Sequence, residues 1–458
     1  MYLSIPDKHT THFYSQKQQL TRKQMHTIFI KNYGCASNTA DAETIAGCLK
    51  QAGYQLSTNE TEATIIIYNT CAVKGPTENR IINDIKQTPK NKKIILTGCL
   101  PKINLERLTK EVHFDAATGP STGQEIPNII QQILQNQKTT ITPLTPPKEK
   151  PPLTLPKLPT NPLISIIPIN FGCLGNCSYC CVVHARGHLQ SYTIPQITHR
   201  IQTDHQTGCQ EFWLTSQDTA SYGHDINTNL AQLLHHTTTT QNLPQNIHIR
   251  VGMMTPNLVT PIQTQLINAF KDPRIFKFLH LPIQSGDNKI LSAMNRFYTT
   301  EEFQTITQTF KETFPNLTIA TDVIVGFPGE TTQAFNNTLN ILKKIQPDIT
   351  NVSKFFARPK TPAWNIQEGL VDKDEIKHRS TLTAELAKQI STQRNKTWIG
   401  WSGEAFVDEK GKIPHTWISR NFAYKPIVIK SNTTLLGKTL QVEITEASPT
   451  YLKGKIIN

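Results

Sequence analysis

The chain has 458 residues, of which 37% are hydrophobic and 18% charged, so it can build about two to four packed domains. These values exclude a globally disordered or collagen-like chain. Lys and Arg number 47 against 34 Asp and Glu, which gives a net charge of +13. That balance suggests a polyanionic partner, nucleic acid by default, with a merely basic surface as the alternative.

The sequence offers no segment for membrane insertion. No apolar run approaches the roughly 18 residues of a membrane span, and the N-terminus MYLSIPDKHTTHFYSQ has no apolar signal segment. We therefore expect a cytoplasmic protein with no membrane partner. In a reducing compartment the nine cysteines are expected to be metal or cluster ligands wherever their spacing allows it.

The first part of the chain predicts a parallel sheet. Residues 1–25 read as a disordered basic arm. From 26 to 137, apolar strand patterns such as HTIFIKNYG, ATIIIYNT and KKIILTG alternate with helical patterns, and FDAATG predicts a fourth strand. This alternation is typical of an α/β domain of flavodoxin-like or Rossmann-like type. The proline-rich segment 138–162 then predicts a stiff linker and a domain boundary.

Residues 163–393 continue the alternation with six strand candidates: LISIIPIN, EFWLT, IHIRVGM, FKFLHLPI, LTIATDVIV and ITNVSKFF. Six βα units predict a (β/α)6 partial barrel whose chemistry lies at the carboxyl ends of the strands. Residues 394–458 change to five short strands, which predict a small OB-like β-barrel. Its basic residues, with Arg420, Lys425 and Lys430 as candidates, predict RNA binding, and a structural cap is the alternative.

The barrel opens with three closely spaced cysteines. Cys173, Cys177 and Cys180 have C-x3-C-x2-C spacing directly after the first barrel strand. Thiolates ligate iron–sulfur clusters and structural zinc, and zinc is the weaker alternative. Three thiolates leave one iron of a [4Fe-4S] cluster free to chelate S-adenosylmethionine. We interpret Cys181 as a bystander, because adjacent side chains in an extended loop point in opposite directions.

Three further cysteines follow three successive strands of the first domain. Cys35, Cys71 and Cys99 stand just past HTIFIKNYG, ATIIIYNT and KKIILTG, at the edge where open parallel sheets bind ligands. We therefore predict that they hold a second cluster. Cys48 and Cys209 are expected to be core residues.

The span from about residue 27 to 457 resembles the methylthiotransferases of the radical S-adenosylmethionine superfamily. The resemblance rests on HLPIQSGDNKIL, MNRFYT, ATDVIVGFPGET and FFARPKTPA in the barrel, and on GWSGEAFVDE, SRNFAYKPIVI and LLGKTLQVEI in a C-terminal TRAM domain. NTCAVKGPTENR, CVVHARGHLQSY and LTSQDTASYGHDI resemble the archaeal and eukaryotic branch, which acts on N6-threonylcarbamoyladenosine in tRNA, next to the anticodon.

The resemblance implies roles for individual residues. Cys35, Cys71 and Cys99 match the ligands of an auxiliary [4Fe-4S] cluster, and Cys173, Cys177 and Cys180 match those of the radical [4Fe-4S] cluster. The implied contacts to S-adenosylmethionine are Tyr179, Ser216, Asp218, Gln284, Asp322 and Gly326, although TSQD replaces the Gly-Gly-Glu of many members. The anionic threonylcarbamoyl group predicts a basic contact, for which the candidates are Lys74, Arg80 and Arg186.

The implied reaction replaces the C2 hydrogen of N6-threonylcarbamoyladenosine at position 37 of tRNA with a methylthio group. It implies two molecules of S-adenosylmethionine per turnover, the tRNA anticodon stem-loop as partner, an electron donor and a sulfur source. The alternative substrates are isopentenyladenosine in tRNA and an aspartate of a ribosomal protein. The alternative to an enzyme is a non-catalytic RNA-binding protein that carries iron–sulfur clusters.

Overall fold

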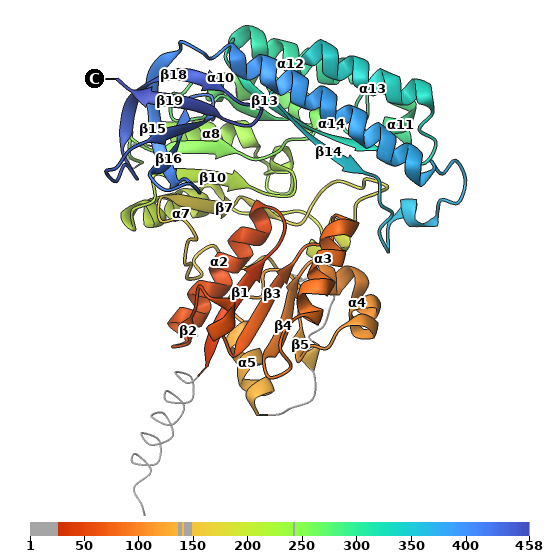
Figure 1. Ribbon diagram of the computed structural model, residues 1–458, viewed down its shortest axis with the longest axis vertical. Helices are drawn as coiled ribbons and strands as arrows, with labels where there is room; N and C mark the ends of the chain where they lie inside the picture. Colours follow the sequence, from red (N-terminus) through yellow and green to blue (C-terminus); the bar gives the residue numbers. More distant parts are fainter. Residues whose placement is uncertain (1–25, 136–139, 142–148, 241–242, 458) are drawn as a thin grey trace, which may run out of the picture. The chain divides into compact units, whose positions relative to one another are not determined.

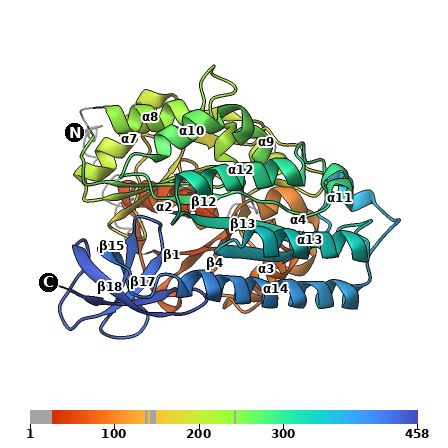
Figure 2. The same ribbon diagram turned by 90° about the horizontal axis from the view of Figure 1, so that it is seen from above.

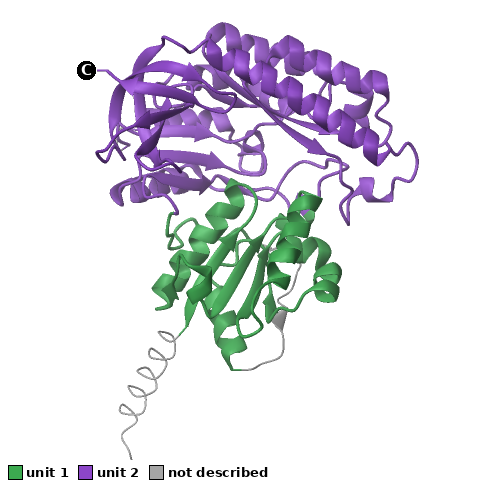
Figure 3. Ribbon diagram, viewed as in Figure 1, with its two compact units in different colours: residues 1–159, 184–186 green, residues 160–183, 187–458 purple. Residues whose placement is uncertain are grey.

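The structure, a computed structural model, describes residues 26–135, 140–141, 149–240 and 243–457. The basic arm expected at residues 1–25 lies outside these ranges. The chain forms two compact units, coloured separately in Figure 3. Unit 1 comprises residues up to Pro159 together with His184–Arg186, and unit 2 comprises Thr160–Val183 and Gly187–Asn458. No helix in the described ranges is both long and apolar enough to cross a bilayer.

Unit 1 is built on one parallel sheet whose strand order is β2-β1-β3-β4-β5-β6 (Figure 1). The order 2-1-3-4-5 is that of flavodoxin-like sheets, whose ligand crevice lies where the order reverses, here between β1 and β3. The strands are β1 (Thr27–Asn32), β2 (Gln55–Leu56), β3 (Ile65–Thr70), β4 (Lys93–Gly98), β5 (Ala116–Ala117) and β6 (Thr140–Ile141). The four expected strands are confirmed, whereas β2 and β6 are too short to leave a pattern in the sequence.

Helices cover both faces of this sheet. The central strand β3 is therefore buried along its whole length. They are α2 (Ala36–Gln51), α3 (Gly75–Lys86), α4 (Leu100–Glu111) and α5 (Ile126–Leu134). Ile45 and Leu49 of α2 share one apolar cluster with Ile130 and Ile133 of α5, so these two helices cover the same face. Helices α3 and α4 contact one another and the strands β3 and β4.

The described end of the proline-rich segment packs on α2. Lys157 forms a buried ion pair with Glu43, with 3.2 Å between Nζ and Oε2, and the Leu158 amide donates to the Glu43 carbonyl. A Cβ at Gly47 would lie 2.3 Å from the Pro156 carbonyl oxygen, so only glycine lets the segment pass at this distance. This end of the predicted linker is therefore a docked part of unit 1.

Unit 2 contains the six parallel strands that the sequence predicts, in two sheets ordered β11-β10-β7 and β12-β13-β14. The strands are β7 (Ile164–Pro168), β10 (Glu211–Thr215), β11 (His248–Val251), β12 (Phe278–His280), β13 (Thr318–Val325) and β14 (Ile349–Lys354). A backbone hydrogen bond from Phe276 to Ile249 joins the two sheets beside β11. The short strands β8 (Asn170–Phe171) and β9 (Gln190–Ser191) pair with each other outside these sheets. The result is the expected open (β/α)6 barrel.

Helices line the outer side of this barrel, as the view of Figure 2 shows. They are α7 (Ile194–Gln206), α8 (Leu230–Thr239), α9 (Pro256–Val259), α10 (Gln263–Phe270), α11 (Asn288–Ala293), α12 (Thr300–Thr313), α13 (Thr332–Ile345) and α14 (Lys373–Lys396), while α6 (Val182–Arg186) follows the first strand and its cysteine loop. Helix α14 runs along β14 and continues into the C-terminal barrel.

The C-terminal segment closes into a five-stranded barrel, which confirms all five expected strands. These are β15 (Ser402–Lys410), β16 (Thr416–Asn421), β17 (Pro426–Lys430), β18 (Thr439–Ala447) and β19 (Leu452–Ile456). Inward residues such as Val407, Ile427 and Val442 form its core.

Two of the basic residues expected to bind RNA are engaged in ion pairs, and one of them, Lys425, joins this barrel to the radical barrel. Lys425 is buried, and its Nζ lies 2.8 Å from Asp348 Oδ1 and 2.8 Å from Asn395 Oδ1. Arg420 pairs with the buried Asp408, with 3.0 Å between Nε and Oδ2. Lys425 is buried in these contacts, so the expectation that it binds RNA is wrong. The side chain of Arg420 is 17% exposed and is engaged by Asp408. Lys430, in contrast, is exposed.

The buried position of Lys425 makes a prediction about stability. Lys425→Met leaves the fully buried Asp348 carboxylate with only part of its charge compensation, and breaking such a pair costs about 3–5 kcal/mol. The matched control Lys430→Met should change the free energy of unfolding by no more than about 0.5 kcal/mol. Denaturant unfolding of both variants measures the difference, and equal midpoints would show that Lys425 does not join the two barrels.

Candidate functional site

Three cysteines lie at the carboxyl edge of the unit 1 sheet, as the sequence predicts. Cys35 follows β1 and is the N-cap residue of α2, Cys71 follows β3, and Cys99 follows β4 and is the N-cap residue of α4. Cys71 and Cys99 are buried, whereas Cys35 is exposed. Helix N-termini favour negative charge, which suits thiolates at two of these positions.

The same three cysteines form one site. A Cβ on Gly34, next to Cys35, would lie 3.2 Å from Cys71 Sγ. Burial raises the pKa of Cys99 to about 12, Arg186 opposes this shift, and the charges of Cys71 and Cys35 reinforce it. Three thiolates at this edge therefore need compensating positive charge, which a bound metal cluster would supply. In the part of the chain that the structure describes, no three such ligands surround a single metal ion. A cubane does not require that arrangement, because each thiolate binds a different iron.

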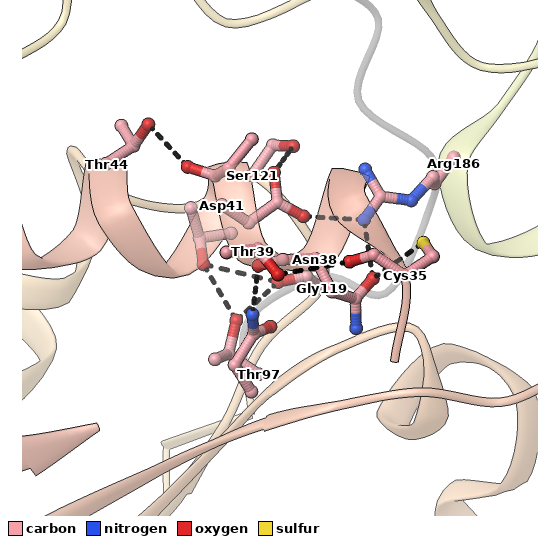
Figure 4. A network of polar contacts seen from close by, with 12 residues as sticks. Cys35, Asn38, Thr39, Asp41, Thr44, Thr97, Gly119, Ser121 and Arg186 are labelled. Carbon is pink, nitrogen blue, oxygen red and sulfur yellow. Dashed lines mark hydrogen bonds and ion pairs between the residues drawn. The ribbon is translucent and has the colours of Figure 1, made fainter. Parts of the chain in front are cut away.

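Arg186 lies in this cysteine site and is not available to a substrate carboxylate. Its Nη2 lies 2.6 Å from Asp41 Oδ2 and 3.0 Å from Asn38 Oδ1, and Ser121 donates to the other oxygen of Asp41 (Figure 4). Only 4% of Arg186 is exposed. The sequence-based expectation that Arg186 binds substrate is therefore wrong.

Lys74 and Arg80 remain accessible in unit 1. Lys74 is the N-cap residue of α3, and Arg80 lies within the same helix. Both are exposed. The Arg80 guanidinium lies over the Tyr33 ring, 5.2 Å from its centroid. This contact fixes the direction of the side chain while leaving its charge in solvent.

The second cysteine set lies in unit 2, in the loop between β8 and α6. Burial raises the pKa of Cys173 to about 12 and also raises the pKa of Cys180. The Gly175 amide donates to Cys173 Sγ at 3.2 Å, and Arg296 Nη1 donates to Cys177 Sγ at 3.1 Å. The loop thus presents three thiols to one place and supplies donors for their charged forms.

Two neighbouring segments hold this loop in place. The Ser178 amide donates to the Met294 carbonyl, and the Ala363 amide donates to the Ser178 carbonyl. Tyr179 packs against the apolar cluster that contains Met294, Phe327 and Ala363. This packing fixes the orientation of the Tyr179 ring.

Of the other residues expected to contact the cofactor, Asp218 lies close enough to Cys173 to influence its charge. Asp218 is buried, and its Oδ1 accepts from the amides of Ala220 and Thr255, so it also caps the short helix η2 (Thr219–Ser221). Ser216 is partly exposed and accepts from the Asp218 amide.

The remaining three lie at β13 and beside it. The Gln284 amide donates to the Asp322 carbonyl, with Gln284 at a φ of +66°. The Asp322 carboxylate accepts from His280 Nε2 at 3.0 Å. Gly326 has a φ of +79°, and a Cβ there would lie 2.4 Å from Ile376, which is a packing reason for glycine.

The sequence analysis did not identify Asn38, Asp41 and Arg296. Arg296 lies inside the sequence motif MNRFYT, which the sequence analysis used. The contact of Arg296 with Cys177 could not be predicted from that motif. Asn38 and Asp41 follow Cys35 by three and six residues, which places them on the first turns of α2. No sequence pattern pairs them with an arginine that is about 145 positions away.

Comparison with known proteins identifies the family. The chain matches an uncharacterized protein family, UPF0004, over residues 27–119, the radical SAM superfamily over 167–342, and the TRAM domain over 404–457. A probable threonylcarbamoyladenosine tRNA methylthiotransferase of Pyrococcus horikoshii is 38% identical over 94% of this chain and 99% of its own length. The threonylcarbamoyladenosine tRNA methylthiotransferase of Homo sapiens is 33% identical over 94% of this chain and 74% of its own length.

The chain belongs to the threonylcarbamoyladenosine tRNA methylthiotransferase family. Among solved structures, the radical S-adenosylmethionine methyltransferase TsrM from Kitasatospora setae has a TM-score of 0.52 at 11% identity and covers 74% of each chain. This second likeness concerns the fold alone.

The contact between Gly34 and Cys71 makes a prediction about iron binding. Gly34 has a φ of +113°, and a Cβ there would lie 2.8 Å from Cys71 Cβ. Gly34→Ala should displace Cys71 and lower the iron content of the reconstituted protein. Gly53→Ala is the matched control, since Gly53 has a φ of +86° with open space around its Cβ position. Iron analysis that gives the same content for both variants would contradict the close approach.

Proposed function

We infer that this chain is a tRNA methylthiotransferase that converts N6-threonylcarbamoyladenosine at position 37 to its 2-methylthio form. The observation that carries this inference is the presence of two sets of three cysteines, one in each compact unit. One set follows three parallel strands, and the other lies in the loop between β8 and α6. The family relationship over 94% of the chain supports it. The basic balance of 47 Lys and Arg against 34 Asp and Glu suits an RNA substrate.

Each cysteine set fits a [4Fe-4S] cluster, because its buried thiols are costly to ionise without metal. Cys173, Cys177 and Cys180 would hold the radical cluster and Cys35, Cys71 and Cys99 the auxiliary one. When bound, the clusters and two molecules of S-adenosylmethionine supply the electron, the radical that activates C2, and the sulfur and methyl group that replace its hydrogen. The protein binds and orients these groups.

Side chains of the chain itself set the local charge and position. Arg296 donates to Cys177 Sγ and so stabilises a negatively charged sulfur there. Tyr179 is fixed by packing, and the family resemblance implies that its ring lies against the adenine of S-adenosylmethionine. Asp218 and Ser216 lie after β10, where the resemblance implies contacts with the methionine part. Gln284, Asp322 and Gly326 complete this set from the region of β13.

The substrate carries a carboxylate on its threonylcarbamoyl group. Lys74 and Arg80 are exposed on α3, close in sequence to Cys71, and either can bind that carboxylate. The tRNA anticodon stem-loop also needs phosphate contacts, for which Lys430 on β17 is the remaining candidate of the C-terminal barrel. An electron donor and a sulfur source complete the set of partners.

The substrate assignment is tested by the modification state of the tRNA. Reconstituted enzyme should thiolate tRNA that carries threonylcarbamoyladenosine far faster than tRNA with unmodified adenosine, since Lys74 and Arg80 have no anion to bind in the latter. Nucleoside mass spectrometry after anaerobic reaction measures both rates. Thiolation of isopentenyladenosine tRNA together with no product from the threonylcarbamoyl form would show that the substrate assignment is wrong.

The two-cluster assignment is tested by replacing each cysteine set with Ala. Loss of Cys35, Cys71 and Cys99 should roughly halve the iron, if both clusters are four-iron cubanes, and abolish the methylthio product. That variant should still release 5′-deoxyadenosine under strong reduction. Loss of Cys173, Cys177 and Cys180 should abolish 5′-deoxyadenosine and leave the other half of the iron. Complete loss of iron from either variant would mean that all six cysteines serve one cluster.

A further inference from the structure

The buried arginine of unit 1 has no place in the reaction as described above. Arg186 ends α6 and lies six residues after Cys180 in sequence, yet in the structure His184–Arg186 belong to unit 1. Its guanidinium therefore serves the site of Cys35, Cys71 and Cys99. A buried arginine is costly unless its charge is compensated, so its placement beside cysteines calls for a physical reason.

The contacts of Arg186 are directed at the helix that Cys35 begins. Nη2 binds Asn38 Oδ1 and Asp41 Oδ2, both on the first turns of α2, and the Cys35 thiol faces the same Asn38 oxygen at 3.9 Å (Figure 4). Asn38 also donates to the carbonyls of Tyr33 and Thr70, the residues two before Cys35 and one before Cys71. Asn38 thus connects the backbone next to Cys35 and Cys71 with Arg186 through hydrogen bonds.

The charge of Arg186 also acts on the cysteines. Arg186 lies close enough to Cys35 and Cys99 to interact electrostatically with both. Asp41 orients the guanidinium beside these cysteines. Ser121 holds the second oxygen of Asp41 at 2.7 Å, which fixes the carboxylate in turn.

We propose that Arg186 is a positioning residue of the auxiliary cluster site, which orders the first turn of α2 and places one fixed positive charge beside Cys35 and Cys99. This inference rests on the proposed function, because it takes a cluster to occupy that site. A cluster with three thiolate ligands is negatively charged, so a nearby cation stabilises its reduced form most. Arg186 therefore raises the reduction potential of the cluster and slows the loss of its iron.

The test uses the full chain with Cys173, Cys177 and Cys180 replaced by Ala, so that only the auxiliary cluster contributes to the spectrum. In this parent, Arg186→Gln should shift the reduction potential in the negative direction and speed iron loss to a chelator at least tenfold. Arg186→Lys should retain most of the potential because it keeps the charge. Arg107→Gln is the matched control, since Arg107 pairs with Glu78 and Glu111 in the same unit.

A second variant separates this role from a merely structural one. Arg186→Gln combined with Asp41→Asn removes both members of the buried pair, so thermal stability should return toward that of the parent while most of the shift in potential remains. An unchanged potential and iron-loss rate in Arg186→Gln would overturn the proposal. So would loss of iron and of thermal stability in both Arg186→Gln and Arg186→Lys, which would assign only a structural role. A parent without iron would instead overturn the two-cluster function.

Discussion

Both cysteine sites depend on one electrostatic constraint, which is the cost of holding several thiolates away from water. Cys99 and Cys180 lie where burial strongly disfavours their charged forms. A site of this kind is stable only if positive charge and hydrogen-bond donors meet the sulfurs. Each site supplies both from the protein. Arg186 and two helix N-termini serve one set, while Arg296 and the Gly175 amide serve the other.

The fold satisfies this constraint in a different way in each unit. Parallel strands all end at the same edge of a sheet, and the helices that follow them begin there. Cysteines placed just after successive strands therefore converge at that edge. Regular βα spacing brings Cys35, Cys71 and Cys99 together across β1, β3 and β4. In unit 2 a single loop carries all three cysteines, and the segments at Met294 and Ala363 hold it against the barrel. Convergence comes from the sheet in the first case and from the loop in the second.

This difference explains how much could be predicted from the sequence. Strand periodicity and cysteine spacing are local signals, and they predicted the three folded regions and both cysteine sets. The role of a cation depends instead on its partner, which can be far away in the sequence. Lys425 and its acceptor Asp348 are 77 residues apart, and Arg186 and Asp41 are 145 apart. Arg420 and Lys425 stand beside aromatic residues in the sequence, a pattern that predicted RNA contacts. In the structure both are held in ion pairs.

These buried pairs bear on where the positive charge of the protein can act. Each pair removes one cation and one anion together, so Arg186 with Asp41 and Arg420 with Asp408 leave the net charge unchanged. The excess of +13 must therefore come from residues outside such pairs. Cations of that kind, such as Lys74, Arg80 and Lys430, are exposed to solvent, where a phosphate backbone can meet them. The basic balance thus keeps its significance for RNA binding even though Lys425 joins the two barrels and Arg420 pairs with Asp408 inside the C-terminal one.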